Sequence, residues 1–302
     1  MTEHLARLAR FTVTMHKPHY VLYGVLWVLA VEGTAALATQ PDQPWRPTWE
    51  TAVRVGVIAI VLLYLRMVDE QKDLEYDAVN NPDRPLVTGA VSAGELRAAM
   101  AVIVAVSIVA SLALSWQSGL LIALALGYGL ALWGIEAVSD TVRRNILVNL
   151  VVTYPVQLWL TAYVVISAVS TGQARWSWQV VAVTVIFAGA FLQFEFARKT
   201  VRGHRPGAAM YSNALGANGS AAAVLLWAAI AVVADLILVA PWNYTGGHAV
   251  LAWIPLALLA FPAYGTYSFV VGKRDEHPLI PGVVFVLTLY VVLITEAVAL
   301  SG

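Results

Sequence analysis

The chain has 302 residues, no cysteine, equal numbers of acidic and basic residues and a hydrophobic fraction of 60%. Charged residues make up 12% of it, about half of their share in a typical soluble domain. This composition excludes a soluble globular protein, and the lack of cysteine excludes a disulfide framework, thiol catalysis and thiolate metal sites. A formal net charge of zero argues against nucleic acid as a partner.

Residues 1–19 are expected to form an interfacial amphipathic segment, with Leu5, Leu8, Phe11 and Met15 on one side and basic residues on the other. Nine apolar runs follow, each near the ~20 residues that cross a bilayer as a helix. The sequence therefore predicts an all-α polytopic membrane protein. The expected spans are 20–38, 51–68, 96–115, 120–137, 146–168, 177–197, 218–240, 248–271 and 279–300.

The distribution of Lys and Arg predicts the orientation of these spans. If the N-terminus is inside, fifteen of the eighteen basic residues fall on the inner side or at helix ends facing it, and only Arg46, Arg54 and Arg175 fall on the other. Such an imbalance is typical of cytoplasmic loops. We therefore expect an integral cell-membrane protein with a cytoplasmic N-terminus, with all candidate site loops cytoplasmic, and with the C-terminus outside.

An acidic segment follows the second expected span. Six acidic residues occur within fifteen positions: Asp69, Glu70, Asp73, Glu75, Asp77 and Asp83. The i, i+4, i+8 spacing of Asp69, Asp73 and Asp77 places them on one face of a helix, where their charges repel. Mg²⁺ bridging these carboxylates to a substrate phosphate would remove the repulsion. A solvated acidic loop is the alternative, but the adjoining apolar run favours the metal interpretation.

Two further loops on the same expected side supply bases and amides. The first runs from Asp140 to Asn145, and the second from Phe194 to Pro206. Guanidinium and ammonium groups opposite a carboxylate-bound Mg²⁺ would suit a diphosphate. Topology alone would also supply such bases, so that alternative stays open for four of them: Arg143, Arg144, Arg198 and Lys199.

Five acidic residues lie inside the expected spans, where ionisable groups are costly and mark functional positions. Glu136 and Glu195 lie near the cytoplasmic ends, within reach of a site there. Glu32, Asp235 and Glu296 lie toward the outer half, where hydrogen bonding between helices is the favoured role. Proline within the spans, at Pro155, Pro255 and Pro262, predicts kinks.

These motifs resemble those of the UbiA superfamily of intramembrane prenyltransferases, over essentially the whole chain. That family has nine transmembrane helices around a central cavity. Its first acidic motif, Asn-x₃-Asp-x₃-Asp, follows helix two; Asp73 and Asp77 match its aspartates, and Asp69 stands where asparagine is usual. The run from Pro82 to Pro85 is similar to the Arg-Pro turn after that motif. The resemblance implies a single UbiA-type domain over residues 1–302.

The family's second motif, Asp-x₃-Asp after helix six, is altered in this chain. Glu195 stands for its first acid, but Lys199 occupies the place of the second. The segment resembles a divergent branch that carries Glu-x-x-Arg-Lys. That branch tends to keep acids directly after the proline, whereas Pro206-Gly-Ala-Ala209 contains none. The departure calls a complete second metal site into question, and one interpretation is that Arg198, Lys199 and Arg202 take over part of the charge neutralisation.

The resemblance implies a Mg²⁺-dependent enzyme that ionises an isoprenyl diphosphate and transfers the prenyl group to an acceptor, expected to be aromatic. A membrane terpene cyclase, in which the substrate's own double bond captures the cation, is the alternative. A transporter or an inactive binding protein is a third hypothesis, but the chain has no internal repeat or midplane charge pair.

The same resemblance implies roles for individual residues. The implied catalytic residues are Asp69, Asp73 and Asp77, which with Glu195 are also the implied metal ligands. The implied diphosphate-binding residues are Lys72, Arg84, Arg143, Arg144, Arg198, Lys199 and Arg202. The implied cavity residues are Asn149, Tyr154, Glu195, Tyr211 and Asn213.

Overall fold

The computed structural model describes residues 2–302, which fold into helices joined by loops, with one isolated β-bridge between Val201 and Glu276. Within this described part, nine stretches are long and apolar enough to cross a membrane, so the protein is an integral membrane protein. They are α2 (Pro18–Thr39), α3 (Trp49–Lys72), α5 (Ala93–Leu112), α6 (Trp116–Val138), α8 with α9 (Ile146–Thr153 and Pro155–Ser170), α10 (Trp178–Arg198), α11 (Tyr211–Val239), α12 with α13 (Gly246–Leu258 and Ala260–Val270) and α14 (Leu279–Ala299).

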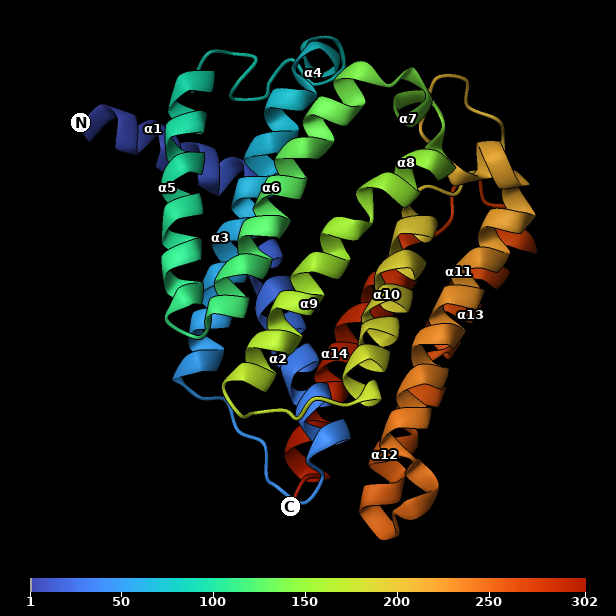
Figure 1. Ribbon diagram of the computed structural model, residues 1–302. Helices are drawn as coiled ribbons and strands as arrows, with labels where there is room; N and C mark the ends of the chain where they lie inside the picture. The colour runs from blue at the N-terminus through green and yellow to red at the C-terminus, as the bar shows by residue number, and fades with distance from the viewer. Residues whose placement is uncertain (1) are drawn as a thin grey trace.

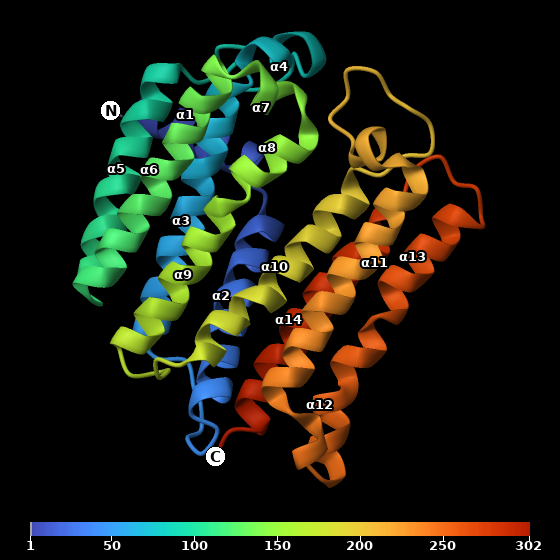
Figure 2. The ribbon, with the colours of Figure 1, turned by 45° about the vertical axis from the view of Figure 1, so that its right-hand side comes forward.

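Shorter elements lie at the ends of these spans. They are α1 (Thr2–Met15), α4 (Leu74–Asn80), α7 (Asp140–Arg144) and the 3₁₀ helix η1 (Pro241–Asn243). In the bundle, α2, α10 and α14 pack against one another in the middle, with α3, α5, α6 and α9 on one side and α11, α12 and α13 on the other (Figures 1 and 2). Helix α1 lies across the spans beside α5 (Figure 1).

Proline and glycine break three of the spans. Pro155 has no N–H to continue the helix ladder, and α8 ends before it while α9 begins at it. Pro255 and Pro262 lie on either side of the break between α12 and α13. Gly216 interrupts α11 with φ 72° and ψ 162°, a conformation that only glycine adopts readily. The breaks at the prolines agree with the kinks expected from the sequence, whereas the one at Gly216 was not predicted.

A buried ion pair joins three helices at the end of the bundle away from α4 and α7. The Arg54 guanidinium lies 2.7 Å from Glu32, and both side chains are fully buried. Thr51 donates a hydrogen bond to Glu32, and Arg54 donates to the carbonyl of Ser167 on α9. The expected helix-to-helix role of Glu32 is therefore confirmed. Among the described residues, the buried carboxylates of Asp235 and Glu296 have no hydrogen-bond partner.

Candidate active site

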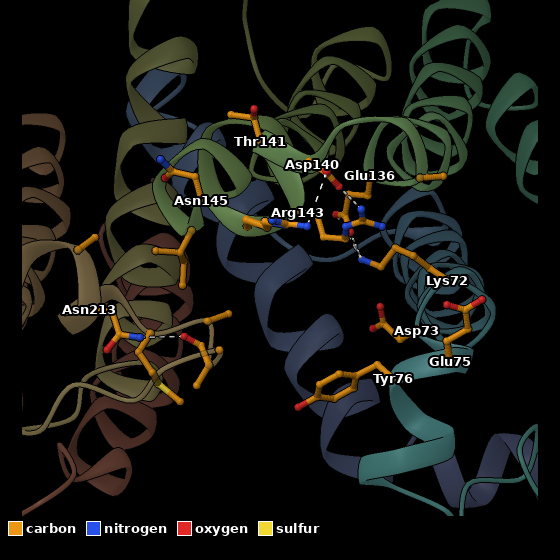
Figure 3. A pocket seen from close by; sticks show the side chains of 18 of the residues that line it. Lys72, Asp73, Glu75, Tyr76, Glu136, Asp140, Thr141, Arg143, Asn145 and Asn213 are labelled. Carbon is orange, nitrogen blue, oxygen red and sulfur yellow. Dashed lines mark hydrogen bonds and ion pairs between the residues drawn. The ribbon is translucent and has the colours of Figure 1, made fainter.

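A hollow of about 1190 Å³ opens at the end of the bundle that carries α4 and α7 (Figure 3). Three parts of the chain line it: the end of α3 with α4, the end of α6 with α7 and the start of α8, and the loop and first turn that lead into α11. Five of the residues expected in a site line this hollow, namely Lys72, Asp73, Arg143, Arg144 and Asn213. The three loops singled out from the sequence therefore meet at one place.

The three aspartates of the acidic segment do not share one environment, because the helix breaks between them. Helix α3 ends at Lys72, and Asp73 sits at the junction to α4 with φ −92° and ψ 11°. Asp73 lines the hollow. Asp77 is 2% exposed and is turned toward Arg84, while Asp69 is 51% exposed and lies 3.6 Å from the Lys72 ammonium. One continuous face of aspartates was expected, and the break replaces it with three separate positions.

The Lys72 ammonium lies between carboxylates that come from two spans. It is 3.6 Å from Asp69 on its own helix and 3.2 Å from Glu136 at the end of α6. Asn149 on α8 donates a hydrogen bond of 3.3 Å to the same Glu136 carboxylate. In Figure 3 the Lys72 side chain reaches toward Glu136, with Asp73 below it. Lys72 thus ties α3 to α6 at the wall of the hollow.

Two carboxylates of the hollow have pKa values that shift in opposite directions. Burial, strengthened by the negative charges of Asp69, Asp77 and Glu136, raises the pKa of Asp73 above its ordinary value, although Lys72 opposes the shift. A hydrogen bond from Arg143, helped by the charge of Arg144, lowers the pKa of Asp140. Asp140 is thus compensated by its own helix, whereas the side chain of Asp73 has no ion pair or hydrogen bond among the described residues.

Asp77 and Glu70 are held by arginines in a network beside the hollow. Arg84, from the loop after α4, donates to Glu70 at 2.8 Å and also to Asp77. Arg66 pairs with Glu70, and Asn81 donates to Asp77 at 2.8 Å. Glu70 and Asp77 are 1% and 2% exposed, so their charges depend on these partners. Arg84 therefore acts in this structure as a partner of the acidic segment.

The expected second acidic position is already compensated by bases. Glu195 accepts hydrogen bonds from Arg198 at 2.7 and 3.0 Å and pairs with Lys199 at 2.7 Å. Lys199 also lies over the ring of Tyr211, which stacks on Phe196 with 4.2 Å between centroids. None of these five residues lines the hollow. They form a compact cluster at the junction of α10 and α11.

Arg202 and Asn213 shape the loop that walls the hollow on the side of α11. Arg202 donates to the carbonyl of Arg274 at 3.1 Å and lies over the ring of Phe269. These contacts fasten the loop to the end of α13 and to the segment that follows it. Asn213 accepts from the backbone N–H of Arg205 and donates to the carbonyls of Arg205 and Ala208. Tyr154, at the break between α8 and α9, lies outside the hollow.

The acidic residues at this end of the bundle fit one magnesium ion better than two. Among the described residues, no three His, Asp or Glu side chains are already grouped as a metal site. Asp73 is an uncompensated carboxylate facing the hollow, with Asp69 on the preceding turn, and hard oxygen donors of this kind suit Mg²⁺. Asp77 and Glu195 are held by arginine and lysine. The assignment of these four acids as metal ligands stays a prediction.

Two aromatic residues of the hollow were not predicted as site residues. Tyr76, on α4, lies one turn after Asp73, and Figure 3 shows its ring at the edge of the opening. Trp133 lies one turn before Glu136 on α6. Their signal in the sequence was their spacing of three residues from Asp73 and Glu136, which places each pair on one face of a helix.

Comparison with solved structures supports the fold. The chain is 17% identical to a UbiA homolog from Aeropyrum pernix K1, with a TM-score of 0.62 over 90% of this chain and 96% of that one. It is 13% identical to a UbiA homolog from Archaeoglobus fulgidus bound to DMAPP and Mg²⁺, with a TM-score of 0.59 over 95% and 98%. It is 11% identical to a digeranylgeranylglyceryl phosphate synthase, with a TM-score of 0.64 over 97% of this chain and 99% of that one.

These likenesses confirm the all-α, nine-span fold expected from the sequence. No curated protein matches the chain significantly. The model of the UbiA prenyltransferase family matches residues 24–293, which is most of the sequence. The chain therefore belongs to the UbiA prenyltransferase family, whose enzymes act on isoprenyl diphosphates.

Proposed function

We propose that this protein ionises an isoprenyl diphosphate at the hollow and transfers the prenyl group to an aromatic acceptor. One observation carries the proposal: carboxylates and bases from two separate parts of the chain, α3 with α4 and α6 with α7, line a single hollow at the end of a membrane-spanning bundle, and the loop into α11 adds the amide of Asn213. Such a site can hold a charged head group while an apolar chain extends between the helices. The bound DMAPP and Mg²⁺ of the Archaeoglobus fulgidus homolog support the same class of ligand.

The charges of the hollow favour a divalent cation as cofactor. Four carboxylates line it (Asp73, Glu75, Glu136 and Asp140), against three fixed positive charges (Lys72, Arg143 and Arg144). A diphosphate would therefore enter a site with an excess of negative charge. Asp73, with Asp69 behind it, would hold Mg²⁺, which when bound supplies charge neutralisation to the diphosphate oxygens.

The bases of the hollow would stabilise the diphosphate as it leaves. Arg143 and Arg144 are 55% and 79% exposed, so their guanidinium groups are free to turn from Asp140 to a ligand. Lys72, beside Asp73, lies near Glu136 on the helix that leads into α7. Negative charge grows on the diphosphate as the allylic C–O bond breaks, and donors already aimed at it lower that barrier. Arg84, Arg198, Lys199 and Arg202, outside the hollow, would act by positioning these loops.

The interior of the bundle would protect the allylic cation from water. Aromatic rings pack together there: Tyr290 lies 5.6 Å from Tyr23 and 5.5 Å from Phe187, and Tyr154 lies 5.8 Å from Phe191, between ring centroids. Such rings exclude water and attract positive charge to their faces. We place the prenyl chain along this apolar interior and the acceptor near the Tyr76 and Trp133 edge of the hollow.

A terpene cyclase is the second candidate. The same interior aromatic rings favour it, because a cyclase has to stabilise a cation that moves along a folded chain. In that reaction no acceptor enters, and a double bond of the substrate forms the new C–C bond before a proton leaves.

Purified protein in detergent or nanodiscs tests both candidates. It is incubated with Mg²⁺ and geranyl, farnesyl or geranylgeranyl diphosphate, with and without a panel of phenolic and quinol-type acceptors. Diphosphate release and organic-extract products are both followed. Asp73→Asn is the variant expected to lose activity, and Asp83→Asn, an equal change of charge on an exposed turn of the same segment, is its matched control.

Diphosphate release and a prenylated product that both require an acceptor would support the transferase. Cyclic hydrocarbons or alcohols formed without an acceptor would identify the cyclase. Equal activity in Asp73→Asn and Asp83→Asn would refute the proposed role of Asp73. Absence of turnover under every condition would overturn the enzymatic proposal and make a non-catalytic binding protein the leading hypothesis.

A further inference from the structure

A second, smaller pocket lies between α1 and the loop after α4. Its volume is about 440 Å³, and its walls include Arg7, Arg10 and Thr14 from α1, and Pro85 and Gly89 from the loop. This α1 pocket is separate from the hollow described above and shares no lining residue with it.

The two arginines of the α1 pocket differ in how their charges are satisfied. Arg7 donates to the Glu95 carboxylate at 2.6 and 2.9 Å and so fastens α1 to the start of α5. Arg10 is exposed, and among the described residues its guanidinium makes one hydrogen bond, to the carbonyl of Ala6 at 3.3 Å, and no ion pair. The pocket therefore has one uncompensated guanidinium available to an anion.

The faces of α1 indicate where this guanidinium stands relative to a bilayer. Phe11 is 1% exposed and packs into the bundle. Leu5 and Val13, on another face, are 61% and 74% exposed. An interfacial helix buries such an apolar face at the boundary of head groups and acyl chains. The face that carries Arg10 and Thr14 lies between the other two. A helix that lies in the interface would hold this face at the level of the head groups.

From this arrangement we propose that the α1 pocket binds the phosphate head group of an anionic membrane lipid. The Arg10 guanidinium pairs with the phosphate, and the Thr14 hydroxyl and the loop backbone at Gly89 form the rest of the cradle. Guanidinium groups suit phosphate oxygens in geometry as well as charge, and basic residues at the membrane surface recognise anionic lipids. The exposed apolar face beside the pocket favours a lipid over a soluble phosphate.

Native mass spectrometry of the full chain, released from detergent after incubation with phosphatidylglycerol or phosphatidylcholine, tests this proposal. The variant is Arg10→Gln, which removes one charge from the exposed face of α1. The matched control is Arg175→Gln, an exposed arginine at the opposite end of the bundle. We expect the apparent affinity for phosphatidylglycerol to fall about fivefold in Arg10→Gln and to stay at the wild-type value in Arg175→Gln.

Equal phosphatidylglycerol binding by wild type and Arg10→Gln would overturn the proposal, as would equal binding of phosphatidylcholine and phosphatidylglycerol by the wild type. Inorganic phosphate is added in a third arm. Displacement of the lipid by phosphate would identify a site for soluble phosphates and likewise overturn it, whereas retention of the lipid supports it. Equal size-exclusion profiles of the three proteins establish that each is folded.

Discussion

Asp73 differs from Asp69 and Asp77, the other two aspartates of the i, i+4, i+8 pattern, because the chain bends at it. Asp69 has Lys72 and Asp77 has Arg84, whereas Asp73 faces the hollow without a partner among the described residues. An uncompensated carboxylate next to other carboxylates is costly in the free protein. A bound cation would remove that cost, so we expect cation binding to compensate the charge of Asp73.

The raised pKa of Asp73 predicts the acid limb of the activity. Because its folded pKa lies above the ordinary value of 3.8, Asp73 takes up a proton at a pH where an exposed aspartate is still ionised. Turnover that needs its carboxylate is therefore lost as the pH falls through this raised pKa. Lys72 lowers the pKa, so Lys72→Met should move the acid limb of diphosphate release to higher pH.

The readout for this prediction is the apparent pKa of the limb, because Lys72→Met is also expected to lower the rate itself. Asp83→Asn serves as the control and should keep the wild-type limb. If the apparent pKa of the acid limb in Lys72→Met is unchanged or lower, the acid limb does not report the protonation of Asp73.

Arg84 is expected to contribute to stability through the buried carboxylates that it holds. In Arg84→Met, Asp77 keeps only its hydrogen bond from Asn81, and removing one partner of a buried pair costs about 3 kcal/mol. The matched change Arg205→Met breaks a pair with Glu276 in which both side chains are about half exposed, and it should cost under about 1 kcal/mol. Thermal unfolding in micelles measures both, and equal losses would argue against this role of Arg84.

At the scale of elements, the sequence predicts the spans well because hydropathy acts over about twenty residues. All nine spans were expected, and the proline breaks at Pro155 and near Pro255 follow from a missing N–H. The division of the acidic segment was not predictable, because it depends on one backbone junction at Asp73. The ion pair of Arg54 with Glu32 was missed for a related reason: the two residues lie on separate helices, and only packing brings them together.

Helices α10 and α11 approach closely at Gly189. A Cβ atom there would lie 2.6 Å from the backbone carbonyl oxygen of Trp227 and 2.8 Å from the backbone nitrogen of Ala231. Gly189→Ala should therefore separate the two helices and cost about 1–3 kcal/mol. Gly127→Ala on α6 is the control, since its Cβ meets nothing within 4 Å, and better helix propensity should stabilise it by up to about 1 kcal/mol.

Denaturation by heat in one detergent compares these two glycine variants with the wild type. If Gly189→Ala unfolds at the wild-type temperature or above it, the close approach of α10 and α11 is not a constraint on the fold.

At the scale of the whole molecule, polar groups concentrate at the two ends of the bundle and serve different purposes. At one end Arg54 and Glu32 are fully buried and fully bonded, which fixes α2, α3 and α9. At the other end Arg143 and Arg144 are exposed and the carboxylate of Asp73 is uncompensated among the described residues. The contacts at the first end hold helices rigidly together, whereas the groups at the second end are available to a charged ligand. The second end also holds most of the basic residues.

That asymmetry predicts the orientation in the cell membrane, since loops rich in Lys and Arg stay in the cytoplasm. The chain has no cysteine, so one introduced cysteine gives a unique label. Asp83→Cys lies on the exposed loop between α4 and α5, near the hollow, and Gln43→Cys on the exposed loop between α2 and α3. A membrane-impermeant maleimide added to intact cells should label Gln43→Cys at once and Asp83→Cys only after permeabilisation. The reverse pattern would place the hollow outside the cell and contradict the cytoplasmic site, because a diphosphate would then have to approach from the opposite face.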